Sequence, residues 1–229
     1  MPDVFNETTV AEMVKAGVIY GHKKSKTHPR MRPFIAGNRN EIELLDPEAI
    51  FGGLAKAILF LKEKVKAGGS VLLVGTNPAA KSSVLSFAQG FKLPYVVTRW
   101  LGGTLTNFAV LNKRKQYYND LKVKKESGAL AKYTKKEQLE FSNEITKLAK
   151  FFDGLENLAR LPDAIFIVDI KEHETAFREA KKTNVPVVAI LDTDDDTDDV
   201  AYPIFANDHS KSSIEWVMEK IKEGIKNGE

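Results

Sequence analysis

The stretch AIFIVDIKEHETAFREAKKTNVPVVAILD, residues 164–192, decides the fold class. Two short apolar runs, 164–169 and 186–192, flank a helical segment from about Glu172 to Lys182. Apolar strands that alternate with helices are typical of parallel sheets, whose strands are buried on both faces. The stretch therefore predicts a βαβ unit and an α/β protein with helices on both sides of a mainly parallel sheet.

The same alternation occurs upstream. VLLVG from residue 71 is a buried strand, Asn77-Pro78 opens a helix that ends near Gly90, and PYVVT at 94–98 is a further strand. A helix before this unit begins at Asp46, which is an N-cap followed by proline, and an amphipathic helix from about Ser210 ends the chain. Both halves of the chain thus predict one sheet flanked by helices.

Residues 105–155 do not fit the sheet. Apolar residues at helical spacing form a seam on two segments separated by SGALAKY, and Thr134 with Glu137 forms a capping box at the start of the second segment. This pattern predicts an antiparallel helical hairpin, with eleven Lys or Arg against six Asp or Glu between 109 and 153. We expect an α/β core at 1–104 and 156–229 and an inserted coiled-coil hairpin at 105–155.

Charge is strongly segregated along the chain, although the net charge is only +3. Residues 13–40 contain seven Lys or Arg and no acid, whereas residues 191–210 contain seven aspartates and no Lys or Arg. The basic segment is predicted to attract phosphate and the acidic segment to repel it.

The absence of cysteine excludes disulfides, thiolate metal sites and cysteine nucleophiles. No apolar run approaches the roughly 20 residues of a membrane span, so we expect a cytoplasmic protein.

The basic segment GHKKSKTHPRMRPF, 21–34, is predicted to be a loop, followed by a hairpin around the turn at 37–40, all within 18–46. Unpaired like charges repel, so polyanion binding is favoured over a merely solvated loop. His22 and His28 lie six residues apart with no carboxylate nearby in sequence, which is a poor ligand set, so no metal site is predicted.

Two further segments leave an alternative open, namely a nucleotide- or metal-dependent phosphate-handling enzyme. The turn at 74–77 could hold a phosphate but lacks both glycine-rich nucleotide spacings, so a structural strand-to-helix turn is favoured. LDTDDDTDD, 191–199, could bind Mg²⁺, but Thr197 and Pro203 break the calcium-loop spacing and Asp196 breaks the aspartyl-phosphate spacing. A solvated acidic loop or adventitious ion binding is favoured there over a catalytic centre.

The segment RWLGGTLTNF at 99–108 resembles the signature of the ribosomal protein S2 family. AGVIYGH, PRMRPFI, VGT, LPYV, KKEQL, LPDAIFIVD and VPVVAILDT match the same family in order. The resemblance implies a flavodoxin-like fold with a coiled-coil hairpin, no catalysis and no cofactor. It also implies a structural constituent of the small ribosomal subunit that binds rRNA, contacts neighbouring ribosomal proteins and supports assembly and translation. Helping to dock ribosomal protein S1 is a further expectation.

From charge and resemblance together, we expect rRNA contacts from cations that converge on one surface. The predicted contact residues are Lys23, Lys24, Lys26, Arg30, Arg32, Arg39, Arg99, Trp100, Lys113 and Arg114. Trp100 suits packing at the hairpin base equally well, through a cation–π contact.

Overall fold

A five-stranded parallel sheet forms the centre of the molecule in the computed structural model, which describes residues 7–226. Its strand order is β5-β4-β6-β7-β8. The strands are β4 (Val71–Val74), β5 (Tyr95–Val96), β6 (Ala164–Val168), β7 (Val187–Leu191) and β8 (Tyr202–Phe205). Counted along the chain, this order is 2-1-3-4-5, which is that of flavodoxin-like proteins. The predicted fold class is confirmed.

The central strands are buried on both faces, as their uninterrupted apolar sequences predict. Every residue of β4, β6 and β7 is buried. The edge strand β8 was not predicted, because it is short and contains Pro203. Proline lacks an N–H donor and is tolerated mainly in edge strands, so the run YPIF gives a weak strand signal.

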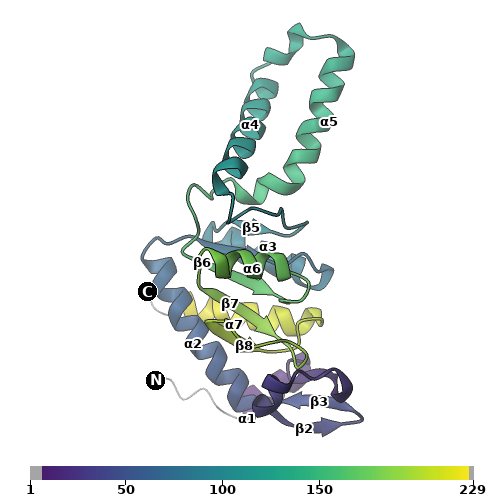
Figure 1. Cartoon of the computed structure of the whole chain (residues 1–229), viewed down its shortest axis with the longest axis vertical. Coiled ribbons are helices and arrows are strands. Elements are labelled where there is room, and N and C mark those ends of the chain that lie inside the picture. Colours follow the sequence, from purple (N-terminus) through teal and green to yellow (C-terminus); the bar gives the residue numbers. More distant parts are fainter. Residues whose placement is uncertain (1–6, 227–229) are drawn as a thin grey trace.

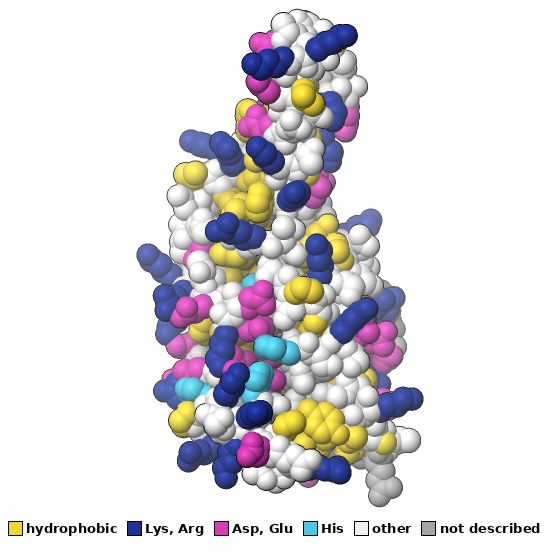
Figure 2. Space-filling model, turned by 90° about the vertical axis from the view of Figure 1, so that its right-hand side faces the viewer, with side chains coloured by type: hydrophobic (Ala, Val, Ile, Leu, Met, Phe, Trp, Pro, Cys, Tyr) yellow, Lys and Arg dark blue, Asp and Glu magenta, His cyan; other side chains and the backbone are white. Residues whose placement is uncertain are grey.

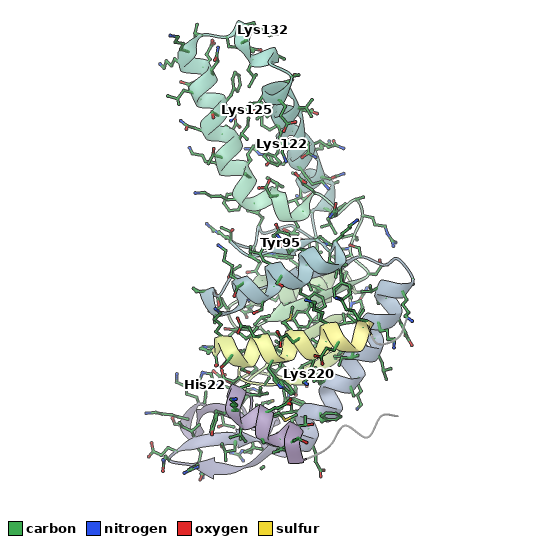
Figure 3. All side chains as sticks on the ribbon, turned by 180° about the vertical axis from the view of Figure 1, so that it is seen from behind. His22, Tyr95, Lys122, Lys125, Lys132 and Lys220 are labelled. Carbon is green, nitrogen blue, oxygen red and sulfur yellow. The ribbon has the colours of Figure 1, made fainter. Side chains whose placement is uncertain are left out.

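Helices cover both faces of the sheet. They are α2 (Pro47–Lys66), α3 (Pro78–Phe91), α6 (Glu174–Lys182) and α7 (Lys211–Lys226), preceded by α1 (Glu7–Ala16). The helices α3 and α7 lie on one face and α6 lies on the other (Figures 1 and 3). The predicted caps are confirmed, since Asp46 accepts a hydrogen bond from the backbone N–H of Glu48 at 3.1 Å and Asn77 accepts one from Ala79 at 3.0 Å.

A small antiparallel sheet lies beside the β8 edge. Its strands β1 (Tyr20–Lys23), β2 (Ile35–Arg39) and β3 (Ile42–Leu45) run in the order β1-β3-β2. The predicted hairpin is confirmed, but its turn lies at Asn40 and Glu41, whose φ angles are 51° and 65°. The Phe34 ring stacks on the Phe205 ring at 4.2 Å and so fixes the small sheet against the end of β8.

The segment predicted as a basic loop is more ordered than expected. It forms β1 and two 3₁₀ helices, η1 (Lys24–Lys26) and η2 (Pro29–Phe34). The backbone N–H of Lys24 donates to the Glu41 carbonyl at 2.9 Å, which holds the segment against the hairpin. The cations of this segment therefore lie on β1, η1 and η2 rather than on an irregular loop.

Two long helices, α4 (Phe108–Glu126) and α5 (Lys135–Phe152), project beyond the β5 end of the sheet (Figure 1). They are joined through η3 (Ala129–Lys132), and η4 (Asp153–Leu155) follows α5. The predicted capping box of Thr134 and Glu137 is confirmed. Lys125 Nζ donates to Ser142 Oγ at 3.1 Å across the pair. A division of the chain at 104 and 156 into a core and an inserted hairpin stays a prediction.

The base of the projecting pair is tied to the rest of the molecule by a buried lysine. Lys115 is only 7% exposed, and its Nζ donates to the carbonyl oxygens of Leu155 at 3.4 Å and Leu158 at 2.5 Å. Burial lowers the pKa of Lys115. Between residues 7 and 226, no helix has the length and apolar character to cross a membrane.

Candidate nucleic-acid interface

The predicted contact residues form two groups at opposite edges of the five-stranded sheet. The N-terminal group, next to β8, comprises Lys23, Lys24, Lys26, Arg30, Arg32 and Arg39. The hairpin-base group, which follows β5 and enters α4, comprises Arg99, Trp100, Lys113 and Arg114. Neighbouring strands lie about 4.8 Å apart, so the two edges are separated by about 19 Å. The expected convergence into one patch is wrong, because the sheet stands between the two groups.

One face of the molecule carries Lys and Arg side chains toward both ends (Figure 2). Acidic and histidine side chains gather between them on that face (Figure 2). A long polyanion could reach both ends, whereas a short one would meet either end alone.

Arg30 differs from the rest of the N-terminal group, because it is paired with the acidic segment. Its Nη1 lies 2.8 Å from both carboxylate oxygens of Asp196 and also pairs with Asp198. These ion pairs raise the pKa of Arg30, the hydrogen bond to Asp196 being the main cause. Arg30 therefore bridges η2 and the acidic segment.

The backbone joins the same two segments. The N–H of His28 donates to the Thr193 carbonyl at 2.9 Å, and the N–H of His22 donates to Thr193 Oγ1 at 2.8 Å. The segments that were predicted to attract and to repel phosphate therefore lie against each other. The N-terminal strand crosses the carboxyl ends of β7 and β8, and a count of charge along the sequence cannot detect that arrangement.

The other five cations of the N-terminal group remain available to a partner. Lys23, Lys24, Lys26, Arg32 and Arg39 are exposed, and none forms an ion pair with another described residue. Unpaired like charges held on one surface create a positive potential that attracts polyanions.

The segment 99–108, which contains part of the hairpin-base group, surrounds the carboxylate of Glu179 on α6. Glu179 is only 7% exposed. One oxygen accepts from Trp100 Nε1 at 3.1 Å and Gly103 N at 2.7 Å. The other accepts from Leu105 N at 2.9 Å and Thr106 N at 3.2 Å. The indole N–H of Trp100 is thus used inside the protein, which favours the packing interpretation of this residue. Sequence reasoning missed Glu179.

A cleft of about 610 Å³ lies at the hairpin base. Its lining includes Leu101, Val110, Lys113, Arg114, Tyr117 and Phe151. The guanidinium of Arg114 lies 5.9 Å from the centroid of the Tyr117 ring, and Val110 and Tyr117 are 58% and 40% exposed. The cleft therefore combines apolar walls with cations at its rim.

The turn at 74–77 is fixed by packing and by internal hydrogen bonds, which agrees with the strand-to-helix turn that the sequence favoured over a phosphate site. A Cβ on Gly75 would lie 2.9 Å from Val84 Cγ2, so helix packing requires glycine there. The backbone N–H of Thr76 donates to His173 Nε2 at 3.1 Å, and its hydroxyl donates to Glu172 at 3.0 Å. These donors are already used within the protein.

Comparison with known proteins assigns the chain to a family. Residues 13–228 match the family model described as ribosomal protein S2. The "Small ribosomal subunit protein uS2" of Coprothermobacter proteolyticus is 39% identical over 96% of this chain and 82% of its own length. The protein of that name from Roseiflexus sp. is 41% identical over 95% and 83%, and that from Chloroflexus aggregans is 37% identical over 96% and 92%.

These relatives are named as components of the small ribosomal subunit, and the family is one of structural proteins rather than enzymes. The alternative of a phosphate-handling enzyme is therefore wrong. With its matching motifs, its 2-1-3-4-5 sheet and its match over almost the whole length, the chain belongs to the ribosomal protein S2 family.

Proposed function

We propose that the chain binds small-subunit rRNA through its N-terminal and hairpin-base groups, in support of subunit assembly and translation. The observation that carries this proposal is the set of five exposed, unpaired cations of the N-terminal group. Such cations displace the counterions of the RNA phosphates when they bind, and this release supplies a large share of the affinity. Membership of a ribosomal family supports RNA, among polyanions, as the partner.

The hairpin-base group adds a different chemistry. Lys113, Arg114 and Arg99 are exposed, and the cleft beside Lys113 and Arg114 has apolar walls. Single-stranded or bulged RNA presents unstacked bases that bind to such surfaces, with aromatic and guanidinium groups as stacking partners. We infer that this group contacts both phosphates and bases.

The proposal predicts a loss of rRNA affinity in the variant Lys23→Ala/Lys24→Ala/Lys26→Ala. Each lost phosphate contact lowers the slope of log K against log salt by about 0.9, so three contacts remove nearly three units. We expect binding to intact small-subunit rRNA to weaken by about 10- to 100-fold at moderate salt. Filter binding at several salt concentrations measures both quantities.

The matched control is the variant Lys56→Ala/Lys62→Ala/Lys66→Ala, which removes three lysines from α2. It has the same net charge as the triple variant of the N-terminal group. We expect its salt slope to stay close to that of the unmodified chain. Equal slopes in the two triple variants would show that only net charge matters and would contradict the assigned interface.

We also propose that the chain helps ribosomal protein S1 to dock on the small subunit. This part of the proposal rests on family membership alone. It is tested by reconstituting small subunits with and without this chain and measuring how much S1 sediments with them. Equal amounts in both preparations would refute it.

A further inference from the structure

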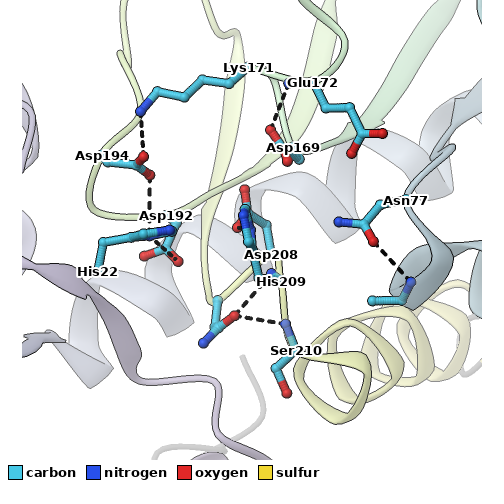
Figure 4. A network of polar contacts seen from close by, with 12 residues as sticks. His22, Asn77, Asp169, Lys171, Glu172, Asp192, Asp194, Asp208, His209 and Ser210 are labelled. Atoms are coloured by element: carbon cyan, nitrogen blue, oxygen red, sulfur yellow. Dashed lines mark hydrogen bonds and ion pairs between the residues drawn. The ribbon is translucent and has the colours of Figure 1, made fainter. Parts of the chain in front are cut away.

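Three strands of the parallel sheet deliver acidic side chains to one edge. Asp169 follows β6, Asp192 follows β7, and Asp208 lies three residues beyond β8. Parallel strands end at the same edge of a sheet, so these residues gather there although the sequence separates them. Figure 4 shows them together with His22 from β1 and His209.

Three of these residues have the geometry of a metal site. Asp169, Asp208 and His209 each offer a ligand atom, and these atoms lie within 4.8 Å of one another. Asp169 and Asp208 are 5% and 1% exposed, whereas the His209 side chain is 58% exposed. The site thus has two buried carboxylates and an imidazole on its open side.

The backbone holds the ligands in place. Asp169 has a φ of 64°, and its Oδ1 accepts from the backbone N–H of Glu172 at 2.9 Å. The side chain of Asn207 accepts from the backbone N–H groups of His209 at 3.0 Å and Ser210 at 2.9 Å. The site is therefore organised before any ligand arrives.

Negative charge exceeds positive charge around this site. Asp192 and Asp195 are each 1% exposed, and Asp194 completes the cluster. Lys171 pairs with Asp194 at 2.5 Å, but among the described residues no Lys or Arg pairs with Asp169, Asp195 or Asp208. A bound cation would offset the cost of burying these charges.

His22 supplies an independent observation from another part of the chain. Its Nδ1 atom is excluded from solvent, and the side chain as a whole is 19% exposed. It points into the cluster, 3.0 Å from Asp192 Oδ2 and 3.3 Å from Asp194 Oδ1. The His22 and His209 rings meet edge to face with centroids 5.0 Å apart. A second imidazole thus borders the same space, with its Nδ1 paired to Asp192.

We propose that Asp169, Asp208 and His209 bind one divalent transition-metal ion of the Zn²⁺ class, with the His22–Asp192 pair beside it. Mg²⁺ and Ca²⁺ prefer sites made only of oxygen ligands. A mixture of imidazole and carboxylate is typical of Zn²⁺, and water would complete the coordination. This inference goes beyond the proposed RNA contacts, which use other residues.

The test is calorimetric titration of the full-length chain without a histidine tag, after treatment with a chelator. We expect one equivalent of Zn²⁺ to bind about tenfold or more tightly than Mg²⁺. The variants Asp208→Asn and His209→Ala should each weaken Zn²⁺ binding by about tenfold or more. Asp208→Asn imitates a protonated carboxyl group, so it preserves the packing while removing the anionic ligand.

Asp120→Asn, which removes an exposed carboxylate on α4, is the control and should bind Zn²⁺ like the unmodified chain. Circular dichroism checks that each variant is folded, and the exposed His209 supplies a second variant if Asp208→Asn is not. Unchanged Zn²⁺ affinity in both site variants, absence of saturable binding, or equally tight Mg²⁺ binding would overturn the proposal. Because no RNA is present, the result is independent of the proposed function.

Discussion

The variant Glu179→Gln is expected to lose about 3 kcal/mol of unfolding free energy. Glu179 accepts hydrogen bonds from Trp100, Gly103, Leu105 and Thr106. Glutamine has the same shape but turns an NH₂ group toward these donors and removes the charge. Hydrogen bonds to a charged acceptor contribute about 1.5–3 kcal/mol each, and a buried donor left without a partner costs about 1–3 kcal/mol. Urea unfolding followed by circular dichroism measures the loss.

The control for this variant is Glu174→Gln in the same helix. Glu174 is exposed and pairs with Arg178 one turn away. Such a surface pair contributes at most about 1 kcal/mol. A loss for Glu179→Gln no larger than that for Glu174→Gln would contradict the organising role of Glu179.

The contribution of Glu179 should also depend on pH. Burial opposes ionisation, but the backbone N–H groups of Gly103 and Leu105 and the Trp100 indole outweigh it and lower the pKa of Glu179 below 4.5. A carboxylate whose pKa is lower in the folded state than in the unfolded state stabilises the fold fully above its unfolded-state pKa. It loses this contribution as the pH falls through the folded-state pKa. The stability difference between the unmodified chain and Glu179→Gln should therefore be constant from pH 7 to 6 and shrink below about pH 4.5. A difference that grows on acidification would contradict this assignment.

The second large effect is expected at the contact of α2 with β8. A Cβ on Gly53 would lie 2.5 Å from the Pro203 carbonyl oxygen, which is backbone and cannot rotate away. Overpacking of this kind costs about 1–3 kcal/mol or more, so Gly53→Ala should destabilise the chain by about 3 kcal/mol. Thermal and urea unfolding measure the change.

The adjacent residue provides an unusually close control. Gly52 lies in the same helix, and a Cβ there would meet nothing within 4 Å. Both substitutions gain the helix propensity of alanine, so Gly52→Ala should stabilise the chain by about 0.5–1 kcal/mol. Effects of the same sign at both positions would show that helix propensity, rather than the contact with β8, decides the outcome.

Sequence patterns predicted the fold where local chemistry determines local structure. β6 and β7 are continuous apolar runs, and Asp46, Asn77 and Thr134 cap helices with their own side chains. β1 was missed because its residues are half-exposed or exposed. Its backbone donates to the Thr193 hydroxyl and accepts from the Asn207 side-chain amide, and both of these residues lie far away in sequence.

The candidate interface was predictable only in part. The exposure of Lys23, Lys24 and Lys26 follows from a segment without acids, but the pairing of Arg30 with Asp196 depends on tertiary structure. Glu179 was undetectable for a different reason, because a glutamate in a charged amphipathic helix looks the same in sequence whether it faces water, as Glu174 does, or the interior.

Because the sheet separates the two cationic groups, an RNA must exceed a minimum length to contact both of them. Its two anchor points lie beyond opposite edges of a sheet that is about 19 Å wide, so an RNA that reaches both binds the second anchor without a further loss of translational freedom. An RNA fragment that reaches one anchor gains nothing from the other. Under the proposed function, the chain thus discriminates a correctly folded rRNA from its isolated pieces by avidity, without reading any base sequence.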